Sequence, residues 1–377
     1  MKLLRIWAVA RKEFLHILRD ARSLAMAIAI PMLLLVLFGY ALTLDVDEVP
    51  VVVWDQSESP ASREFLAAFG GSRYFSFQKH VRNYRELGEA LDSRRAIVGL
   101  VIPTDFSRRI EARRSAPVQM IVDGSDANTA TLAIGYAEAV VEGYSQSLAV
   151  SQIERVSGRR PVPPLEVRPR VWFNAELEGK NYIIPGLIAV IMMVIAATLT
   201  SGTIAREWER NTMEQLISTP LQGRELILGK LLPYFTVGLF DVLLAFLMGK
   251  YLFAVPFRGS VALLFLCAAF FLVGALALGI LISIVARTQL LANQLAMLAT
   301  FLPAFLLSGF LFAIRNMPEA LQWVTYLVPA RYFITLLRGV YLKGIGLETL
   351  ATEALLLMLF GTGLLLLATR KFQKKLG

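Results

Sequence analysis

Five charged residues lie close together between two strongly apolar runs of the sequence: Arg206, Glu207, Glu209, Arg210 and Glu214. Carboxylate and guanidinium groups at this spacing can form charge-assisted hydrogen bonds with complementary groups of a second protein. They can equally be the solvated charges of an interfacial loop, as most such segments are. The charged residues by themselves leave both interpretations open.

The same segment contains signals for a bend followed by a short helix. Thr212 and Gln215 have the spacing of a capping box, with Thr212 as the N-cap and the Gln215 side chain reaching back to it. Asn211, directly before them, is one of the few non-glycine residue types that tolerate a left-handed backbone. We therefore expect an elbow that lies along the membrane surface. The charged residues expected to face water there are Glu207, Arg210 and Glu214.

Three polar residues interrupt apolar runs elsewhere in the chain. Asp241 lies near the middle of one run, where burial of a carboxyl group is costly and favours a position inside a helix bundle or beside a cavity. It could contact a cationic substrate or couple conformations, or it could form structural hydrogen bonds between helices. Asn293 and Gln294 are better explained as interhelical hydrogen-bonding residues than as a substrate site.

A nucleotide-binding loop is not predicted. The nearest match to G-x-x-x-x-G-K-[ST] runs from Gly223 to Leu231, with five residues between its glycines and a leucine where the magnesium-binding hydroxyl is required. We therefore expect no cofactor and no metal in this chain.

The composition indicates an integral membrane protein. Of the 377 residues, 56% are hydrophobic and 18% are charged, and the mean hydropathy is +0.58, which is too apolar for an ordinary soluble enzyme. Six runs are candidates for transmembrane helices, each near the roughly 20 residues that a spanning helix needs. They are residues 23–44, 181–205, 231–249, 259–286, 288–314 and 347–369.

Basic residues predict the orientation of these six spans. Residues 1–22 and the tail 370–377 are both rich in lysine and arginine, so both termini are expected in the cytoplasm together with the loop 206–230. The net charge of +9 then reflects flanks that face anionic lipid, and it does not indicate nucleic-acid binding. In residues 1–22, one helical face carries Leu4, Trp7, Phe14, Ile17 and Leu18, as expected of an interfacial helix.

Residues 45–180 are predicted to form one extracytoplasmic α/β domain, because short strand patterns alternate there with amphipathic helices. The segment Asp123-Gly124-Ser125-Asp126 is read as a turn in which Asp126 or Asn128 caps a long helix. The strands are expected at 49–54, 75–81, 96–102, 118–122 and 166–172, and the helices at 61–69, 84–93, 106–114 and about 128–155. Residues 159–164 are expected to form a stiff connector, and residues 315–346 to form short external helices.

Several motifs resemble those of type 2 ABC exporter permeases of the bacterial drug-efflux branch. The string REWERNTMEQLISTPL, from Arg206 to Leu221, resembles the signature of that family, with Asn211 in place of the usual glycine. Further resemblance is found, in the expected order, at Arg11-Lys12-Glu13-Phe14, Asp123-Gly124-Ser125, Leu307-Ser308-Gly309-Phe310 and Pro329-Ala330-Arg331-Tyr332-Phe333.

The resemblance implies a specific role for the elbow. It would be a coupling helix that docks on a separate ATP-binding subunit, which binds ATP and Mg²⁺, and the five charged residues named first would carry the coupling. The implied setting is a bacterial inner membrane, with a second permease copy or a paralogue, membrane lipids and a periplasmic membrane-fusion adaptor as partners. The implied activity is export of an amphipathic or cationic compound.

Two other classes of function remain open from the residues. An ion-coupled secondary transporter could use Asp241 as its proton site, although the chain lacks the internal repeat that such folds usually carry. A membrane-anchored sensor could use the α/β domain to bind a ligand, although one or two spans would suffice for that role.

Overall fold

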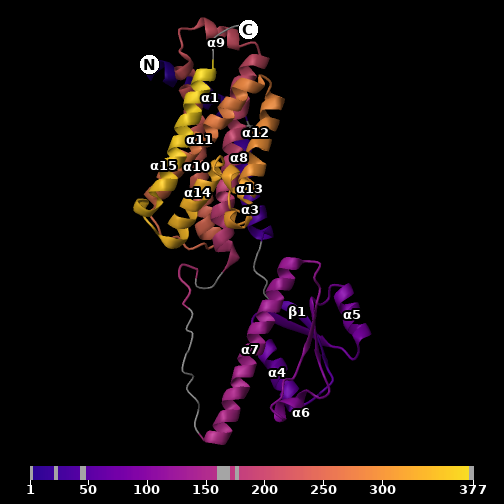
Figure 1. Cartoon of the computed structure of the whole chain (residues 1–377). Helices are drawn as coiled ribbons and strands as arrows, with labels where there is room; N and C mark the ends of the chain where they lie inside the picture. Colours follow the sequence, from indigo (N-terminus) through magenta and orange to yellow (C-terminus); the bar gives the residue numbers. More distant parts are fainter. Residues whose placement is uncertain (1–2, 21–23, 43–47, 159–169, 175–177, 373–377) are drawn as a thin grey trace. The chain divides into compact units, whose positions relative to one another are not determined.

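The computed structural model describes residues 3–20, 24–42, 48–158, 170–174 and 178–372. The chain divides into two compact units, one formed by Met1–Thr43 with Arg170–Gly377 and the other by Leu44–Pro169. The first unit is a bundle of apolar helices, and the second is a β-sheet with helices on both faces (Figure 1).

Among the described residues, five helices are long and apolar enough to cross a membrane. α11 lies centrally and packs against α8, α10, α12 and α15 (Figure 1). The five are α8 (Gly179–Glu209), α10 (Gly223–Leu247) with the π-helical turn Met248–Leu252, α11 (Val261–Ala286), α12 (Gln289–Leu306) and α15 (Leu347–Lys371).

The first of the six predicted spans is shorter than the sequence suggests. Its described part is a π-helical turn, Ala25–Ala29, followed directly by α3 (Ile30–Ala41), which packs against α8. Together these cover about 25 Å at 1.5 Å per residue, less than the roughly 30 Å of a hydrocarbon core. Among the described residues, five of the six predicted spans are therefore helices of spanning length, and the first is represented by a shorter apolar helix.

Two other predicted boundaries differ. α8 continues to Glu209 instead of ending near residue 205, because Arg206, Glu207 and Glu209 are all good helix formers. α12 ends at Leu306 instead of residue 314, and Gly309 follows it with a left-handed backbone (φ 82°) that a helix cannot accommodate. The expected short helices follow as α13 (Glu319–Thr325) and α14 (Pro329–Arg338), after a 3₁₀ turn at Ile314–Asn316 and before a π-helical turn at Gly339–Lys343.

Small residues allow α8 and α11 to pack closely. A Cβ at Gly279 would lie 2.2 Å from the carbonyl oxygen of Ala197, so only glycine fits this crossing. Thr200 donates a hydrogen bond from its hydroxyl to the carbonyl of Leu276 at 2.9 Å. Close backbone approach with a polar bond between helices is the usual way in which membrane helices associate.

Helix α1 (Leu3–Arg19) packs along α10. A Cβ at Gly229 would lie 2.7 Å from the Cβ of Val9, so this glycine sets the contact. The face of α1 against the bundle carries Val9, Ala10, Glu13 and Ile17. Leu4, Trp7, Phe14 and Leu18 are exposed as an interfacial helix requires, whereas the predicted apolar face wrongly included the buried Ile17.

The second unit contains a mixed four-stranded sheet in the order β2-β1-β3-β4. β1 pairs in parallel with β2 on one side and with β3 on the other, and Val51 of β1 lies opposite Val98 of β3. β3 pairs antiparallel with β4. The strands are β1 (Val49–Asp55), β2 (Phe75–His80), β3 (Val98–Ile102) and β4 (Gln119–Val122). These four predicted strands are confirmed. The fifth lies mostly outside the described residues, as does the connector 159–164, and residues 170–172 are not a strand.

Alternating residues of the strands build one core on each face of the sheet. Val51 and Val53 face the core that contains Phe65, whereas Val52 faces the core that contains Leu87. The first core is covered by α4 (Pro60–Gly70), α6 (Phe106–Glu111) and α7 (Ala127–Ser157), and the second by α5 (Tyr84–Asp92).

The turn before α7 has the predicted structural role. Asp123 accepts a hydrogen bond from the amide of Ser125 at 3.0 Å, and Asp126 accepts one from the amide of Asn128 at 3.0 Å as the N-cap of α7. The hydroxyl of Thr129 also donates to Asp126 and lowers the pKa of that carboxyl. The stability that this charged cap adds to the folded state is therefore fully present above the pKa of an unfolded aspartate. It is lost as the pH falls through the lowered pKa of Asp126.

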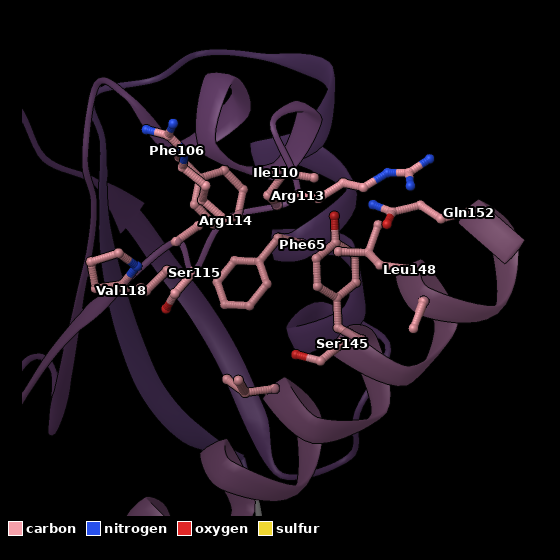
Figure 2. Close-up of a pocket in the computed structure, with 15 residues that line it drawn as sticks. Phe65, Phe106, Ile110, Arg113, Arg114, Ser115, Val118, Ser145, Leu148 and Gln152 are labelled. Carbon is pink, nitrogen blue, oxygen red and sulfur yellow. The ribbon is translucent and has the colours of Figure 1, made fainter.

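A hollow of about 500 Å³ opens beside α7 in the second unit (Figure 2). Phe65, Phe106 and Leu148 give it apolar walls, and Arg113 and Arg114 lie among its lining residues (Figure 2). Among the described residues, the two guanidinium groups form no hydrogen bond or ion pair.

Candidate functional site

Four charged side chains from three helices meet at the end of the bundle that also carries the elbow. We call Lys12 and Glu13 of α1, Glu207 of α8 and Lys230 of α10 the buried charge cluster. The Nζ atom of Lys230 lies 2.5 Å from Oε1 of Glu13 and 3.1 Å from Oε1 of Glu207. The Nζ atom of Lys12 lies 3.1 Å from the same Oε1 of Glu207.

The cluster is enclosed and balanced in charge. Lys230 is 1% exposed, Glu13 4% and Glu207 7%, while Lys12 lies at the exposed edge. Lys230 also donates to the carbonyl oxygen of Thr203 at 3.3 Å, so its three N–H groups have three acceptors. Two positive and two negative charges with satisfied hydrogen bonds are the condition under which buried ions are tolerated.

Glu207 connects this cluster to the elbow. Its carbonyl oxygen accepts the amide of Thr212 at 3.0 Å, and its carboxylate accepts the Thr212 hydroxyl. Asn211 has the expected left-handed backbone, with φ of 56°, and α9 (Met213–Ser218) follows. Thr212 is the N-cap residue of α9, but the predicted capping box is wrong because its hydroxyl binds Glu207 and makes no cap hydrogen bond.

The far end of the elbow is also tied to α1. Arg5 donates to the carbonyl oxygen of Pro220 at 2.5 Å, and its guanidinium lies 3.7 Å from the carboxylate of Glu225. Glu225 in turn accepts the amide of Gln222 at 3.0 Å in a capping box at the start of α10. Helix α1 therefore holds both ends of the segment that contains α9.

The five charged residues predicted for coupling separate into two groups. Arg206 contacts His16 of α1, and Glu207 belongs to the buried charge cluster, so the expectation that Glu207 faces water is wrong. Glu209 is exposed but accepts the amide of Gln289 at 2.9 Å and its side-chain amide at 2.5 Å, at the start of α12. A carboxylate at a helix N-terminus accepts hydrogen bonds from amides that have no partner within the helix. Its negative charge also interacts favourably with the helix dipole.

Arg210 and Glu214 form the second group. Both are exposed, and within the described part of the chain neither side chain forms a hydrogen bond or an ion pair. They lie on either side of the left-handed corner at Asn211. The elbow thus presents two opposite charges outward while Arg206, Glu207 and Glu209 hold it in place.

The polar residues of the spans lie in different surroundings. Asp241 of α10 is 1% exposed, and its Oδ1 atom has no hydrogen-bond partner among the described residues. Asn293 of α12 accepts a hydrogen bond from the hydroxyl of Ser201 in α8 at 2.7 Å, which confirms its interhelical role. Gln294 is exposed on α12 and forms no such bond within the described residues.

The opposite end of the bundle is tied together by Arg338 of α14. Its guanidinium stacks 3.5 Å above the ring of Tyr182 and donates to the carbonyl oxygen of Gly309 at 3.0 Å. The Tyr182 hydroxyl donates to the same carbonyl at 3.2 Å. These bonds explain the position of the Leu307-Ser308-Gly309-Phe310 motif, since they join the segment after α12 to α8 and α14.

Sequence reasoning did not identify Glu13 and Lys230 as site residues. The available signal was that Glu13 shares a helical stripe with Val9 and Ile17. A carboxylate that stays charged in a buried stripe is normally paired with a cation, and Lys230 lies among apolar residues near the start of α10. Within the described residues, no three His, Cys, Asp or Glu side chains come together as a metal site.

The fold and the site define a polytopic helical membrane protein with an α/β domain inserted after its first apolar helix. Residues 21–370 match the family described as ABC-2 family transporter protein, and the chain belongs to that family. It is 40% identical over 341 residues to the probable multidrug ABC transporter permease YbhS of Escherichia coli K12, covering 90% of this chain and 89% of that protein.

Other relatives show similar coverage at lower identity. The probable multidrug ABC transporter permease YbhR of Escherichia coli K12 is 30% identical over 91% of each chain. The inner membrane transport permease YhhJ of the same organism is 26% identical, covering 87% of this chain and 86% of that protein. The resemblance seen in the motifs is confirmed: this chain is an ABC transporter permease subunit without a nucleotide-binding domain, and the ATPase is a separate subunit.

Proposed function

We propose that this permease exports an amphipathic or cationic compound from the cytoplasm by alternating access, driven by its ATP-binding subunit. The names of two relatives, which describe probable multidrug permeases, support the cargo class. Pairing with a second permease copy or a paralogue belongs to the proposal, because the bundle of one chain encloses little volume for a pathway.

The membrane placement that we propose is a bacterial inner membrane with both termini in the cytoplasm. One relative is named an inner membrane permease. The start of α1 and the end of α15 lie at the same end of the bundle as the elbow: Arg5 bonds Pro220, and a Cβ at Gly223 would lie 3.0 Å from the ring of Phe372 (Figure 1). The basic residues near both termini favour the cytoplasm for that end. The short helix Ala27–Ala41 would then be the first of six spans.

The observation that carries the proposal is the outward pair Arg210 and Glu214 on an elbow whose other charges are bound within the chain. A rigid elbow can transmit movement from a docked subunit to α8 and α10, since it joins them directly. Free charges of both signs can pair with opposite charges in a groove of the ATP-binding subunit. For the unit that contains the sheet we propose a periplasmic membrane-fusion adaptor as partner, supported by the open hollow and by its two arginines, Arg113 and Arg114, whose guanidinium groups form no hydrogen bond or ion pair with the described residues.

Reversing both outward charges, Arg210→Glu with Glu214→Lys, tests the coupling role. We expect ATP-dependent efflux to fall by at least about tenfold, because separating a desolvated charge pair at an interface costs on the order of 2 kcal/mol. The measurement is dye transport in inside-out vesicles that contain both subunits, with co-purification of the ATP-binding subunit as a second readout. The thermal midpoint of the purified permease should stay unchanged, since neither side chain has a partner in the described chain.

Glu348→Lys provides the control, because this exposed residue lies at the first turn of α15, at the other end of that helix from Phe372. It should leave efflux and co-purification intact. Normal efflux by the Arg210/Glu214 double variant would remove the support for the elbow as the coupling element.

A second candidate function is ion-coupled transport through Asp241, which its burial and its free Oδ1 atom favour. We expect Asp241→Asn to retain ATP-dependent efflux, and collapse of the proton gradient at constant ATP to leave efflux unchanged. If efflux stops with the gradient, and the Asn variant no longer responds to it, the ion-coupled mechanism is the correct one.

A further inference from the structure

Helix α1 and helix α10 form a groove on the side of α1 that faces away from the buried charge cluster. The groove has a volume of about 610 Å³, within the usual range of ligand sites. Trp7, Phe14 and Leu15 line it from α1, and Leu232 and Pro233 line it from α10. Trp7 is 63% exposed, and Phe14, Leu15 and Leu232 are each about 40% exposed, so large apolar surfaces remain uncovered by the chain itself.

The position of the groove identifies what surrounds it. Leu232 and Pro233 lie in the first half of α10, a helix of membrane-spanning length. Apolar surface at that depth meets lipid chains, and an amphipathic helix such as α1 lies at the boundary between chains and headgroups. A groove between the two helices is therefore open to an acyl chain on one side and to headgroups on the other.

Arg11 gives the groove a headgroup preference. It is the one charged residue among the described residues that line the groove, it is exposed, and its side chain forms no hydrogen bond or ion pair within the described chain. A guanidinium group binds phosphate through two parallel hydrogen bonds. A choline or ethanolamine headgroup adds a cation beside Arg11, and none of the described residues that line the groove carries a carboxylate to receive that cation.

We infer that the α1–α10 groove binds one anionic phospholipid, with an acyl chain between the two helices and the phosphate on Arg11. The bound lipid fills the open side of α1, whose opposite side supplies Lys12 and Glu13 to the buried charge cluster. Occupancy therefore holds α1 against α10 and stabilises the elbow indirectly. The inference rests on the membrane placement of α10 and does not depend on the cargo or on the direction of transport.

The test uses Trp7 as the reporter, in full-length permease reconstituted without the ATP-binding subunit. Lipids with brominated chains quench tryptophan on contact, and the Trp7 signal is the difference in quenching between the native chain and Trp7→Phe. At equal mole fractions we expect brominated phosphatidylglycerol to quench the Trp7 signal about fivefold more effectively than brominated phosphatidylcholine. Arg11→Gln should abolish this preference. Arg19→Gln should keep it, because Arg19 is exposed on the same helix but does not line the groove.

Three results would overturn the inference. Equal quenching by the two brominated lipids would mean that the groove takes any lipid. Identical quenching of the native chain and Trp7→Phe would mean that protein, such as a second permease copy, covers the groove. A headgroup preference that survives Arg11→Gln would mean that the lipid phosphate binds a residue other than Arg11. Because the assay contains no ATPase, loss of ATP-driven efflux in a variant that keeps its Trp7 preference would concern the proposed function alone.

Discussion

Lys230→Met is expected to destabilise the permease by about 3–5 kcal/mol, the usual consequence of removing one partner from a buried ion pair. The variant leaves the carboxylates of Glu13 and Glu207 enclosed together with Lys12 as their remaining cation. The methionine side chain fills much of the same volume, so the loss comes from uncompensated charge. The measurement is the thermal midpoint of the purified permease, followed by near-ultraviolet circular dichroism.

Two further variants isolate the electrostatic cause. Lys250→Met removes an exposed lysine near the other end of the same helical segment and should leave the midpoint close to the native value. Adding Glu13→Gln to Lys230→Met removes the carboxylate that Lys230 paired, while Glu207 keeps Lys12, and should recover part of the loss, as a double-mutant cycle measures. If Lys230→Met has the same thermal midpoint as the native permease, the cluster does not stabilise the fold.

The same variant should weaken coupling. Glu207 holds the Thr212 hydroxyl at the start of α9, and Lys230 is one of the two lysines that fix the Glu207 carboxylate. Without that cation, the ion pair that ties Glu207 to α10 is lost, while Arg210 and Glu214 remain available. We expect ATP hydrolysis by the assembled transporter to continue with less transport per ATP, since docking is retained and the transmitting contact is lost.

The sequence predicts the sheet and most spans well because their signals are local. Val51 and Val53 face one core and Val52 faces the other, so this strand is buried on both faces and is marked in the sequence by a short continuous apolar run. The end of α12 was harder to predict, because residues 307–314 are nearly as apolar as a span. It is set by the left-handed Gly309 and by the hydrogen bond of Arg338 to its carbonyl. That contact joins residues 29 apart in the chain.

Of the candidate site, the sequence predicts the bend of the elbow but not the buried charge cluster that holds it. Asn211 has a local backbone preference, so the corner could be predicted. The burial of Glu207 depends on Lys12 and Lys230, which are 195 and 23 residues away in the chain, and no local pattern specifies that meeting. A charge that faces water and a charge that pairs inside a bundle look alike in sequence. The residues that hold the elbow were therefore grouped with those that we propose to dock.

Gly279→Leu should disrupt the contact between α8 and α11. A Cβ at this position would lie 2.2 Å from the Ala197 carbonyl oxygen, which is backbone and cannot rotate away, so the two helices must separate. We expect a loss of at least about 3 kcal/mol, the upper end of overpacking effects. The measurement is the yield of monodisperse permease together with its thermal midpoint, and Gly279→Ala should show a smaller loss of the same kind.

Gly363→Leu is the matched control, because this glycine of α15 has no neighbouring atom within 4 Å of a Cβ. It makes the same change of residue in an apolar spanning helix and should leave yield and midpoint intact. If the two leucine variants behave alike, the α8–α11 crossing does not explain the loss, because leucine is a better helix former than glycine at both positions. A loss confined to position 279 would show that the crossing fixes α8, and through its last turn the carboxylates of Glu207 and Glu209 that hold the elbow.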